Sequence, residues 1–107
     1  MFKVKLVLDE AKIMKNNKYS VQQCRDILKG IMSVERMKAE TPDLYVMDVN
    51  RNSLGARLTL LGRLKKSEML YYLKEWKNYD DEDNENGELE ESDMLKLLRD
   101  KGELCQN

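Results

Sequence analysis

Residues 2–8 (FKVKLVL) alternate between apolar and polar positions, with lysine at two of the polar ones. This alternation predicts a half-buried β-strand, and Val7 on the polar side predicts partial cover there as well. Helical spacing begins after Ser20, where apolar residues recur every three or four positions through residues 21–31. Ser20 and Gln23 fit a capping box, which satisfies two free backbone N–H groups at the start of a helix. We therefore predict a core helix packed on the first strand.

Residues 34–49 predict a β-hairpin. Residues 41–43 (TPD) supply its turn, because proline fixes φ at the first corner. Residues 44–49 (LYVMDV) are rich in strand-forming residues and predict the second arm. A loop over residues 50–53 then leads to the most apolar part of the chain.

Residues 53–79 hold most of the large apolar residues, and their first half fits two patterns. Leucines over residues 54–65 recur at both helical and alternating spacing. Helix formers dominate there, and Thr59 is the sole β-branched residue, so we predict a helix. A helical arrangement places Arg57 inside the apolar stripe, from which its guanidinium would extend to the edge.

A second helix is predicted from Glu68 to about Asn78, with Ser67 as its cap. The acidic run 80–93 contains nine Asp and Glu and no Lys or Arg, and its mutual repulsion predicts an exposed loop. Residues 94–107 predict a short helix and a frayed tail. The apolar face of the second helix would hold Met69, Tyr72, Leu73 and Trp76.

Together these elements predict a single α+β domain over residues 1–107, with a small antiparallel sheet of two or three strands covered on one face by three or four helices. The domain divides into a basic body (1–79), an acidic loop (80–93) and a C-terminal helix with its tail (94–107). The body holds 16 Lys and Arg against 9 Asp and Glu, whereas residues 80–107 hold 3 against 11. This separation of charge is hidden in a net charge of −1 and is the most distinctive property of the chain.

The composition also argues against several classes of protein. The absence of histidine removes the usual general base and the commonest transition-metal ligand. The first ten residues lack the apolar core of a signal peptide, and no apolar run is long enough to span a membrane. Two distant cysteines, Cys24 and Cys105, form no disulfide framework and indicate a reduced, cytoplasmic protein. With no Gly-rich phosphate loop and no partnered nucleophile, we predict no enzymatic activity and no cofactor.

The acidic run is the leading candidate for function. Spaced carboxylates can imitate the phosphates of nucleic acid and occupy a basic groove on a partner. We therefore predict a bacterial interaction protein that binds a basic protein surface, as a nucleic-acid mimic or inhibitor. A homodimer also stays open, since small domains with thin cores often gain stability by pairing. The predicted contact residues are Asp80, Asp81, Glu82, Asp83 and Glu85, with Trp76 and Tyr79 as an apolar patch beside them.

Calcium binding by the same run is one alternative. Residues 82–93 (EDNENGELEESD), with predicted helices on either side, resemble a degenerate EF-hand loop in which Gly87 makes the sharp turn. The loop departs from the pattern because it starts with Glu, ends with an Asp too short for bidentate contact, and has no second hand to pair with. The calcium ligands would be Glu82, Asn84, Asn86, Glu88, Glu90 and Asp93.

Nucleic-acid binding by the basic body is the other alternative. Three cations, Arg63, Lys65 and Lys66, lie near the aromatic residues Tyr71, Tyr72 and Trp76 in sequence, so phosphate contacts would combine with stacking on bases. Aromatic residues at helical spacing usually belong to a core, which ranks nucleic acid below a basic protein surface as the partner.

The whole layout resembles small proteins of Firmicute bacteria that are often carried on mobile elements. The resemblance rests on KVKLVLDE at the start, Lys18-Tyr19, LKKSEMLYYLKEW, the acidic break YDDED, and SDMLKLL near the end. It implies a helix before the acidic break and carries over no activity and no functional residue. Because small acidic proteins of mobile elements include inhibitors of host nucleases, the resemblance favours mimicry by association.

Overall fold

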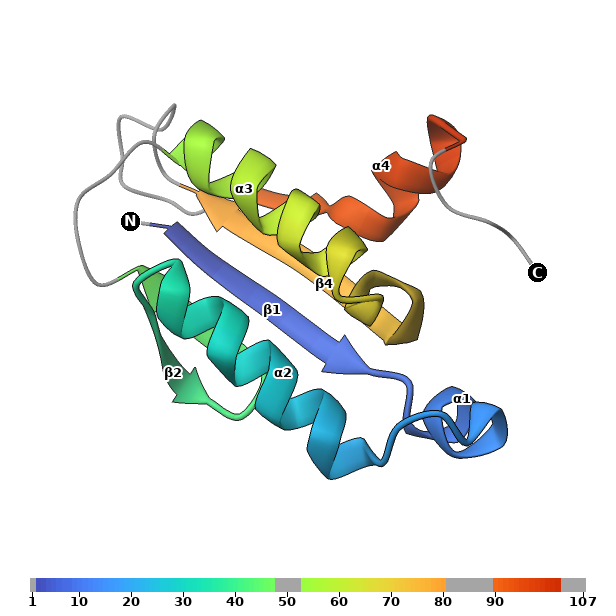
Figure 1. Cartoon of the computed structure of the whole chain (residues 1–107). Helices are drawn as coiled ribbons and strands as arrows, with labels where there is room; N and C mark the ends of the chain where they lie inside the picture. Colours follow the sequence, from blue (N-terminus) through green and yellow to red (C-terminus); the bar gives the residue numbers. More distant parts are fainter. Residues whose placement is uncertain (1, 48–52, 81–89, 103–107) are drawn as a thin grey trace.

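A computed structural model of the chain describes residues 2–47, 53–80 and 90–102. Within these residues the chain forms a five-stranded antiparallel sheet and four α-helices (Figure 1). The predicted α+β class is confirmed, but the predicted two or three strands were too few. The elements in order are β1 (Phe2–Leu8), α1 (Glu10–Asn16), α2 (Val21–Val34), β2 (Met37–Thr41), β3 (Leu44–Met47), α3 (Ser53–Lys66), a 3-10 turn η1 (Met69–Tyr72), β4 (Leu73–Asp80), β5 (Glu90–Asp93) and α4 (Met94–Asp100).

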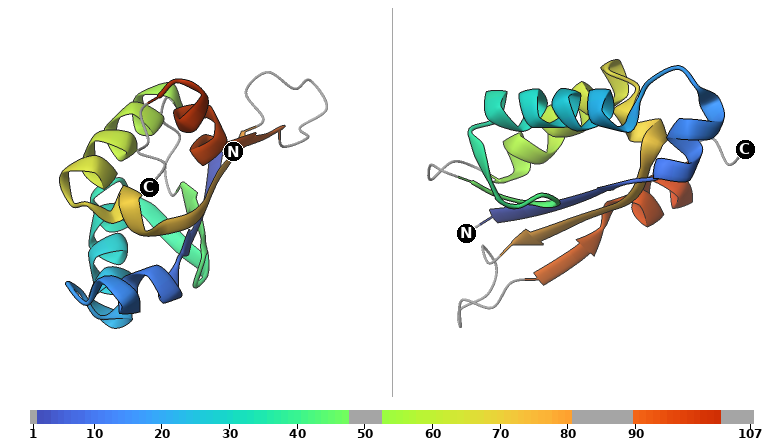
Figure 2. Two further views of the ribbon diagram at one scale, coloured as in Figure 1. Left: turned by 90° about the vertical axis from the view of Figure 1, so that its right-hand side faces the viewer. Right: turned by 90° about the horizontal axis from the view of Figure 1, so that it is seen from below.

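β1 is the central strand of a sheet with the order β2-β3-β1-β4-β5. The succession β1-α2-β2-β3-α3-β4 follows the split βαββαβ arrangement of ferredoxin-like folds, and β5 extends the sheet beside β4. α2 and α3 lie side by side on the same face of the sheet (Figure 2). Alternate β1 side chains are buried, which places the core between this face and the two helices.

Two helices begin where the sequence pattern predicted them. In α2 the Ser20 hydroxyl accepts the backbone N–H of Gln23 at 3.0 Å, and the Gln23 side chain accepts that of Ser20 at 2.8 Å, so the capping box is confirmed. α3 confirms the helix over residues 54–65 and buries Leu60 and Leu64. The side chain of Arg57 lies outside the parts that the structure describes.

The helix predicted from Glu68 to Asn78 is wrong. The chain makes only the turn η1 and then continues as β4, which pairs with β1 along its length. The Ser67 hydroxyl still accepts the backbone N–H of Met69, at 3.3 Å, but no α-helix follows. Pairing with the central strand satisfies the backbone of both segments, and this outweighs local helix propensity.

A β-bulge accounts for the helix-like spacing of apolar residues in β4. Val7 on β1 pairs with Glu75, whereas the next residue, Leu8, pairs with Leu73, so β4 holds one extra residue there. An extra residue reverses the alternation of side chains. Leu73 and Trp76, three positions apart, are therefore both buried in a strand.

Strands also occupy both ends of the acidic run, which was predicted to be a loop. Asp80 ends β4, and Glu90–Asp93 form β5, with Asp80 paired opposite Glu90. Residues 81–89 lie outside the described parts of the chain. The predicted C-terminal helix is confirmed as α4, which Asp93 caps by accepting the backbone N–H of Lys96 at 3.2 Å.

An ion-pair ladder crosses the sheet face opposite α2 and α3. Glu75 on β4 lies 3.1 Å from Lys77 and 3.3 Å from Lys5 on β1, and Lys77 lies 3.0 Å from Glu91 on β5. Hydrogen bonds from Lys77 and then Lys5 lower the pKa of Glu75, and bonds to Glu91 and Glu75 raise the pKa of Lys77. These ion pairs link β5 to the rest of the sheet, and each charge in the ladder lies next to an opposite charge.

Candidate functional site

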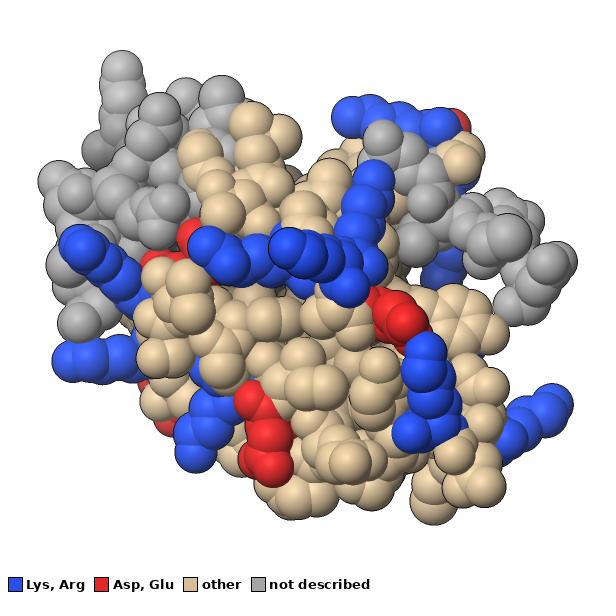
Figure 3. Space-filling view, in the orientation of Figure 1, with Lys and Arg blue, Asp and Glu red and all other residues tan. Residues whose placement is uncertain are grey.

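A cavity of about 500 Å³ collects basic residues from four separate parts of the chain. They are Lys12 on α1, Lys18 between α1 and α2, Lys65 on α3, and Arg99 on α4. Glu68 is the one acidic residue among the described residues that line this basic cavity. Its volume falls within the range of small-molecule sites. Lys and Arg side chains also form a band across α3 on the adjoining surface (Figure 3).

Aromatic rings form one wall of the basic cavity. Tyr72 is buried, and its hydroxyl accepts a hydrogen bond from the Asn16 side chain at 2.7 Å. Its ring meets the rings of Tyr71 and Tyr19 edge to face, with centroids 5.1 and 5.8 Å apart. Edge-to-face contacts on two sides fix the orientation of the Tyr72 ring, so this wall is preorganised.

Tyr71 is half-exposed beside this wall and holds one of the cations. The Lys12 ammonium lies 3.6 Å from the centre of the Tyr71 ring, within the range of a cation–π contact. In this contact the Lys12 ammonium faces a neutral ring and not a carboxylate. Its positive charge is therefore not neutralised by this contact.

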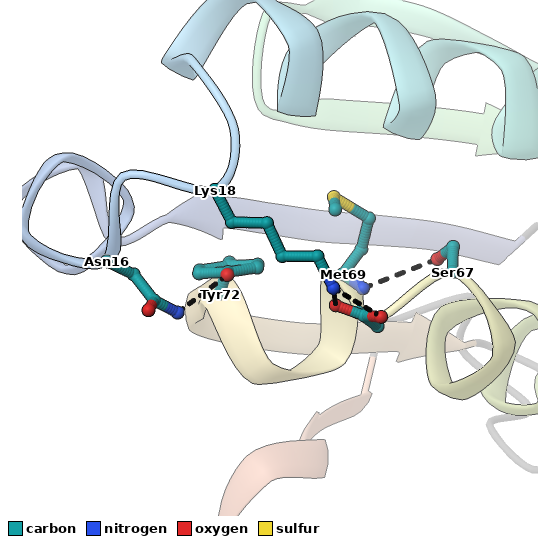
Figure 4. Close-up of polar contacts among 6 residues, drawn as sticks. Asn16, Lys18, Ser67, Met69 and Tyr72 are labelled. Carbon is teal, nitrogen blue, oxygen red and sulfur yellow. Dashed lines mark hydrogen bonds and ion pairs between the residues drawn. The ribbon is translucent and has the colours of Figure 1, made fainter.

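Lys18 and Glu68, which both line the basic cavity, form a two-pronged ion pair. The dashed lines that start from the labelled Lys18 in Figure 4 mark this pair. The Lys18 ammonium donates to both carboxylate oxygens, at 2.7 and 2.9 Å. The hydrogen bond to Glu68 raises the pKa of Lys18, which stays charged at any physiological pH. Glu68 adopts a left-handed backbone conformation, with φ at 69°, that residues other than glycine rarely adopt.

The charges favour an anion in the basic cavity. The Arg99 guanidinium, which lines the cavity, forms no ion pair with a carboxylate among the described residues. Guanidinium and ammonium groups bind phosphate and carboxylate through charge-assisted hydrogen bonds. Four cations against one carboxylate give the lining a net positive charge even with the Lys18–Glu68 pair intact.

The structure places only one of the three residues predicted to bind nucleic acid at the basic cavity. Arg63 donates to Glu35 at 2.7 Å, and that carboxylate is buried, so Arg63 has a structural partner. Lys65 lines the basic cavity together with Tyr71. Arg63 and Lys66 line a separate hollow between α2 and α3.

The residues predicted to bind a basic partner fall into two groups. Trp76 is fully buried in β4, so its predicted place in an exposed apolar patch is wrong. Asp80 is buried at the end of β4, and Tyr79 is half-buried on the opposite sheet face. Asp81, Glu82, Asp83 and Glu85 lie outside the described residues, and their role stays a prediction.

Only one of the two helices predicted to flank the calcium loop is present. The strand β4, and not a helix, precedes the loop, whereas α4 follows directly after Asp93 as predicted. The strand β5, which pairs with β4, covers the last four positions of the loop. Glu90 and Asp93 therefore lie on a strand, where Asp93 also caps α4. Glu82, Asn84, Asn86 and Glu88 lie outside the described residues. Within the described ranges, no group of three or more potential ligands is placed to hold a metal ion.

Sequence reasoning missed Lys12, Lys18 and Arg99 as site residues. They lie on three different segments, and each is an ordinary surface cation in its local sequence. Only the packing of α1, η1 and α4 brings them to one cavity. Cys24, the cysteine that the structure describes, is buried in α2, and burial raises the pKa of its thiol, so the nucleophilic thiolate is disfavoured.

Comparisons with protein-family models, with curated proteins and with solved structures gave no match to this chain. In the described part of the chain, no helix combines the length and the apolar composition needed to cross a bilayer.

Proposed function

We propose that this chain is a non-enzymatic binding protein whose basic cavity takes a phosphate-bearing ligand. The observation that carries the proposal is the convergence of Lys12, Lys18, Lys65 and Arg99, from four segments, on one cavity with a single carboxylate. Phosphate oxygens accept the hydrogen bonds that these groups donate. The fixed tyrosine wall supplies an apolar surface for the organic part of such a ligand.

Inorganic pyrophosphate is the probe for this proposal. We expect calorimetry to detect its binding at low salt and Arg99→Met to weaken it at least about 10-fold, because each charge-assisted hydrogen bond contributes about 1.5–3 kcal/mol. Lys65→Met should weaken binding in the same direction. Raising the salt from about 50 to about 200 mM should also weaken binding, since screening reduces the attraction.

Lys96→Met is the matched control, because Lys96 is exposed on the same helix as Arg99 and does not line the cavity. It removes the same charge and should leave pyrophosphate affinity unchanged. An equal loss of affinity in Lys96→Met and Arg99→Met would mean that the net charge of the chain, and not the cavity, attracts the ligand.

A second proposal concerns the acidic run (80–93), called the acidic segment below, which would bind a basic protein surface. The antiparallel β4–β5 pairing favours it, because the sheet holds the two ends of residues 81–89 together at one place. We expect polylysine to bind the chain at low salt and to bind at least about 10-fold more weakly after Asp81→Asn, Glu82→Gln and Asp83→Asn together, as measured by fluorescence anisotropy of labelled polylysine.

A control variant removes three exposed acids from the body, at Glu10, Asp26 and Glu40, and keeps the acidic segment intact. It should retain the affinity of the wild-type chain for polylysine. If polylysine binds both triple variants equally, the acidic segment has no special role in binding basic surfaces.

A further inference from the structure

The Lys18–Glu68 pair carries an inference that rests on the proposed function and narrows its ligand class. We infer that the Glu68 carboxylate holds the place on Lys18 that a phosphate monoester takes, so that the ligand must displace Glu68 to bind. The cavity would then select phosphate monoesters, which carry two charges, over phosphodiesters, which carry one.

The geometry of the pair matches that of a phosphate contact. Lys18 donates to both carboxylate oxygens, at 2.7 and 2.9 Å, as it would to two oxygens of a phosphate group. Both side chains are about half-exposed, at 54% and 50%. An exposed ion pair contributes little to stability, so an incoming anion can replace the carboxylate without disturbing the fold.

The backbone conformation of Glu68 also supports a functional role for this residue. A non-glycine residue with φ at 69° is strained, and such strain concentrates at binding and switch sites. Glycine would fit this turn between α3 and η1 without strain. The chain instead has a glutamate there, whose carboxylate reaches Lys18 on the segment between α1 and α2.

Charge decides which ligand can displace Glu68. A phosphodiester offers Lys18 one negative charge, the same as the carboxylate it must replace. A phosphate monoester offers nearly two at neutral pH, and Coulomb attraction to Lys18, Lys65 and Arg99 rises in proportion. Competition with Glu68 therefore converts a general preference for anions into a preference for dianions.

AMP and 3′,5′-cyclic AMP are matched probes, because they share a nucleoside and differ in being a monoester and a diester. We expect calorimetry to show AMP binding about 10-fold tighter than cyclic AMP. Glu68→Gln should bind AMP about 5- to 10-fold tighter than the wild type and should discriminate less between the two nucleotides. AMP binding should weaken as the pH falls below about 6, where the monoester gains a proton.

Two further variants separate this mechanism from a general effect of charge. Glu10→Gln removes an exposed acid that does not line the cavity and should leave AMP affinity unchanged. In a Lys18→Met background, Glu68→Gln should change AMP affinity less than about two-fold, because the contact in competition is already gone.

The outcomes distinguish the inference from the proposed function. If cyclic AMP binds as tightly as AMP, or if Glu68→Gln binds AMP no tighter than the wild type, the inference is overturned. Pyrophosphate binding that depends on Arg99 would leave the cavity assignment standing in that case. Absence of any pyrophosphate or AMP binding would overturn both.

Discussion

Replacing Trp76 with alanine is expected to lower the free energy of unfolding by about 3–5 kcal/mol, the largest effect of any substitution considered for this chain. The indole is fully buried on β4, opposite Leu6 of the central strand. Its N–H also donates to the Asn78 side-chain oxygen at 2.9 Å. The substitution therefore leaves a large cavity and removes the hydrogen bond of a buried amide. Urea unfolding followed by circular dichroism measures the change.

Trp76→Phe separates the two contributions. It keeps a six-membered aromatic ring and removes the N–H donor with a smaller part of the buried volume, so we expect a loss of about 1–3 kcal/mol. Asn78 is sensitive to this loss, because its buried amide nitrogen already has no hydrogen-bond partner among the described residues. Tyr71→Ala, at an aromatic side chain that is 45% exposed, is the control and should cost less than about 1 kcal/mol. A similarly small cost for Trp76→Ala would support the exposed, helical Trp76 that the sequence pattern predicted.

Replacing Arg63 with methionine is expected to lower the free energy of unfolding by about 1.5–3 kcal/mol. Glu35, at the end of α2, is only 2% exposed. Arg63 on α3 donates a hydrogen bond of 2.7 Å to the Glu35 carboxylate. The substitution removes a charge-assisted hydrogen bond from a buried carboxylate, whose desolvation remains. The methylene stem of Arg63 is largely reproduced by methionine, so the change reports mainly on the charge.

Lys66→Met is the matched control for Arg63, since Lys66 is an exposed cation on the same helix turn and should change stability by less than about 0.5 kcal/mol. In a double-mutant cycle, Glu35→Leu combined with Arg63→Met should recover part of the loss, because an apolar pair avoids burying a charge. A loss in Arg63→Met no larger than that in Lys66→Met would mean that the Glu35 contact contributes nothing, and Arg63 would again be a candidate for ligand binding.

The candidate site could be predicted only in part. Lys65 stood out because it lies among cations and tyrosines in one stretch, and the structure does place it with Tyr71 at the basic cavity. Lys12, Lys18 and Arg99 lie far from that stretch in sequence and gave no local signal. A binding site assembled from four segments depends on how those segments pack, and spacing within one segment contains no such information.

The sequence by itself determined the local structure wherever one pattern was unambiguous: the strand β1, the capped helix α2, the hairpin turn and the C-terminal helix. Side-chain periodicity and capping chemistry act over a few residues and need no distant partner. The tertiary structure decided the segment after Glu68, because Leu73 and Trp76 fit a helix and a bulged strand equally well. Pairing with the backbone of β1 selected the strand. That same pairing turned Trp76 inward, and the packing of α1, α3, η1 and α4 around this side of the sheet formed the basic cavity.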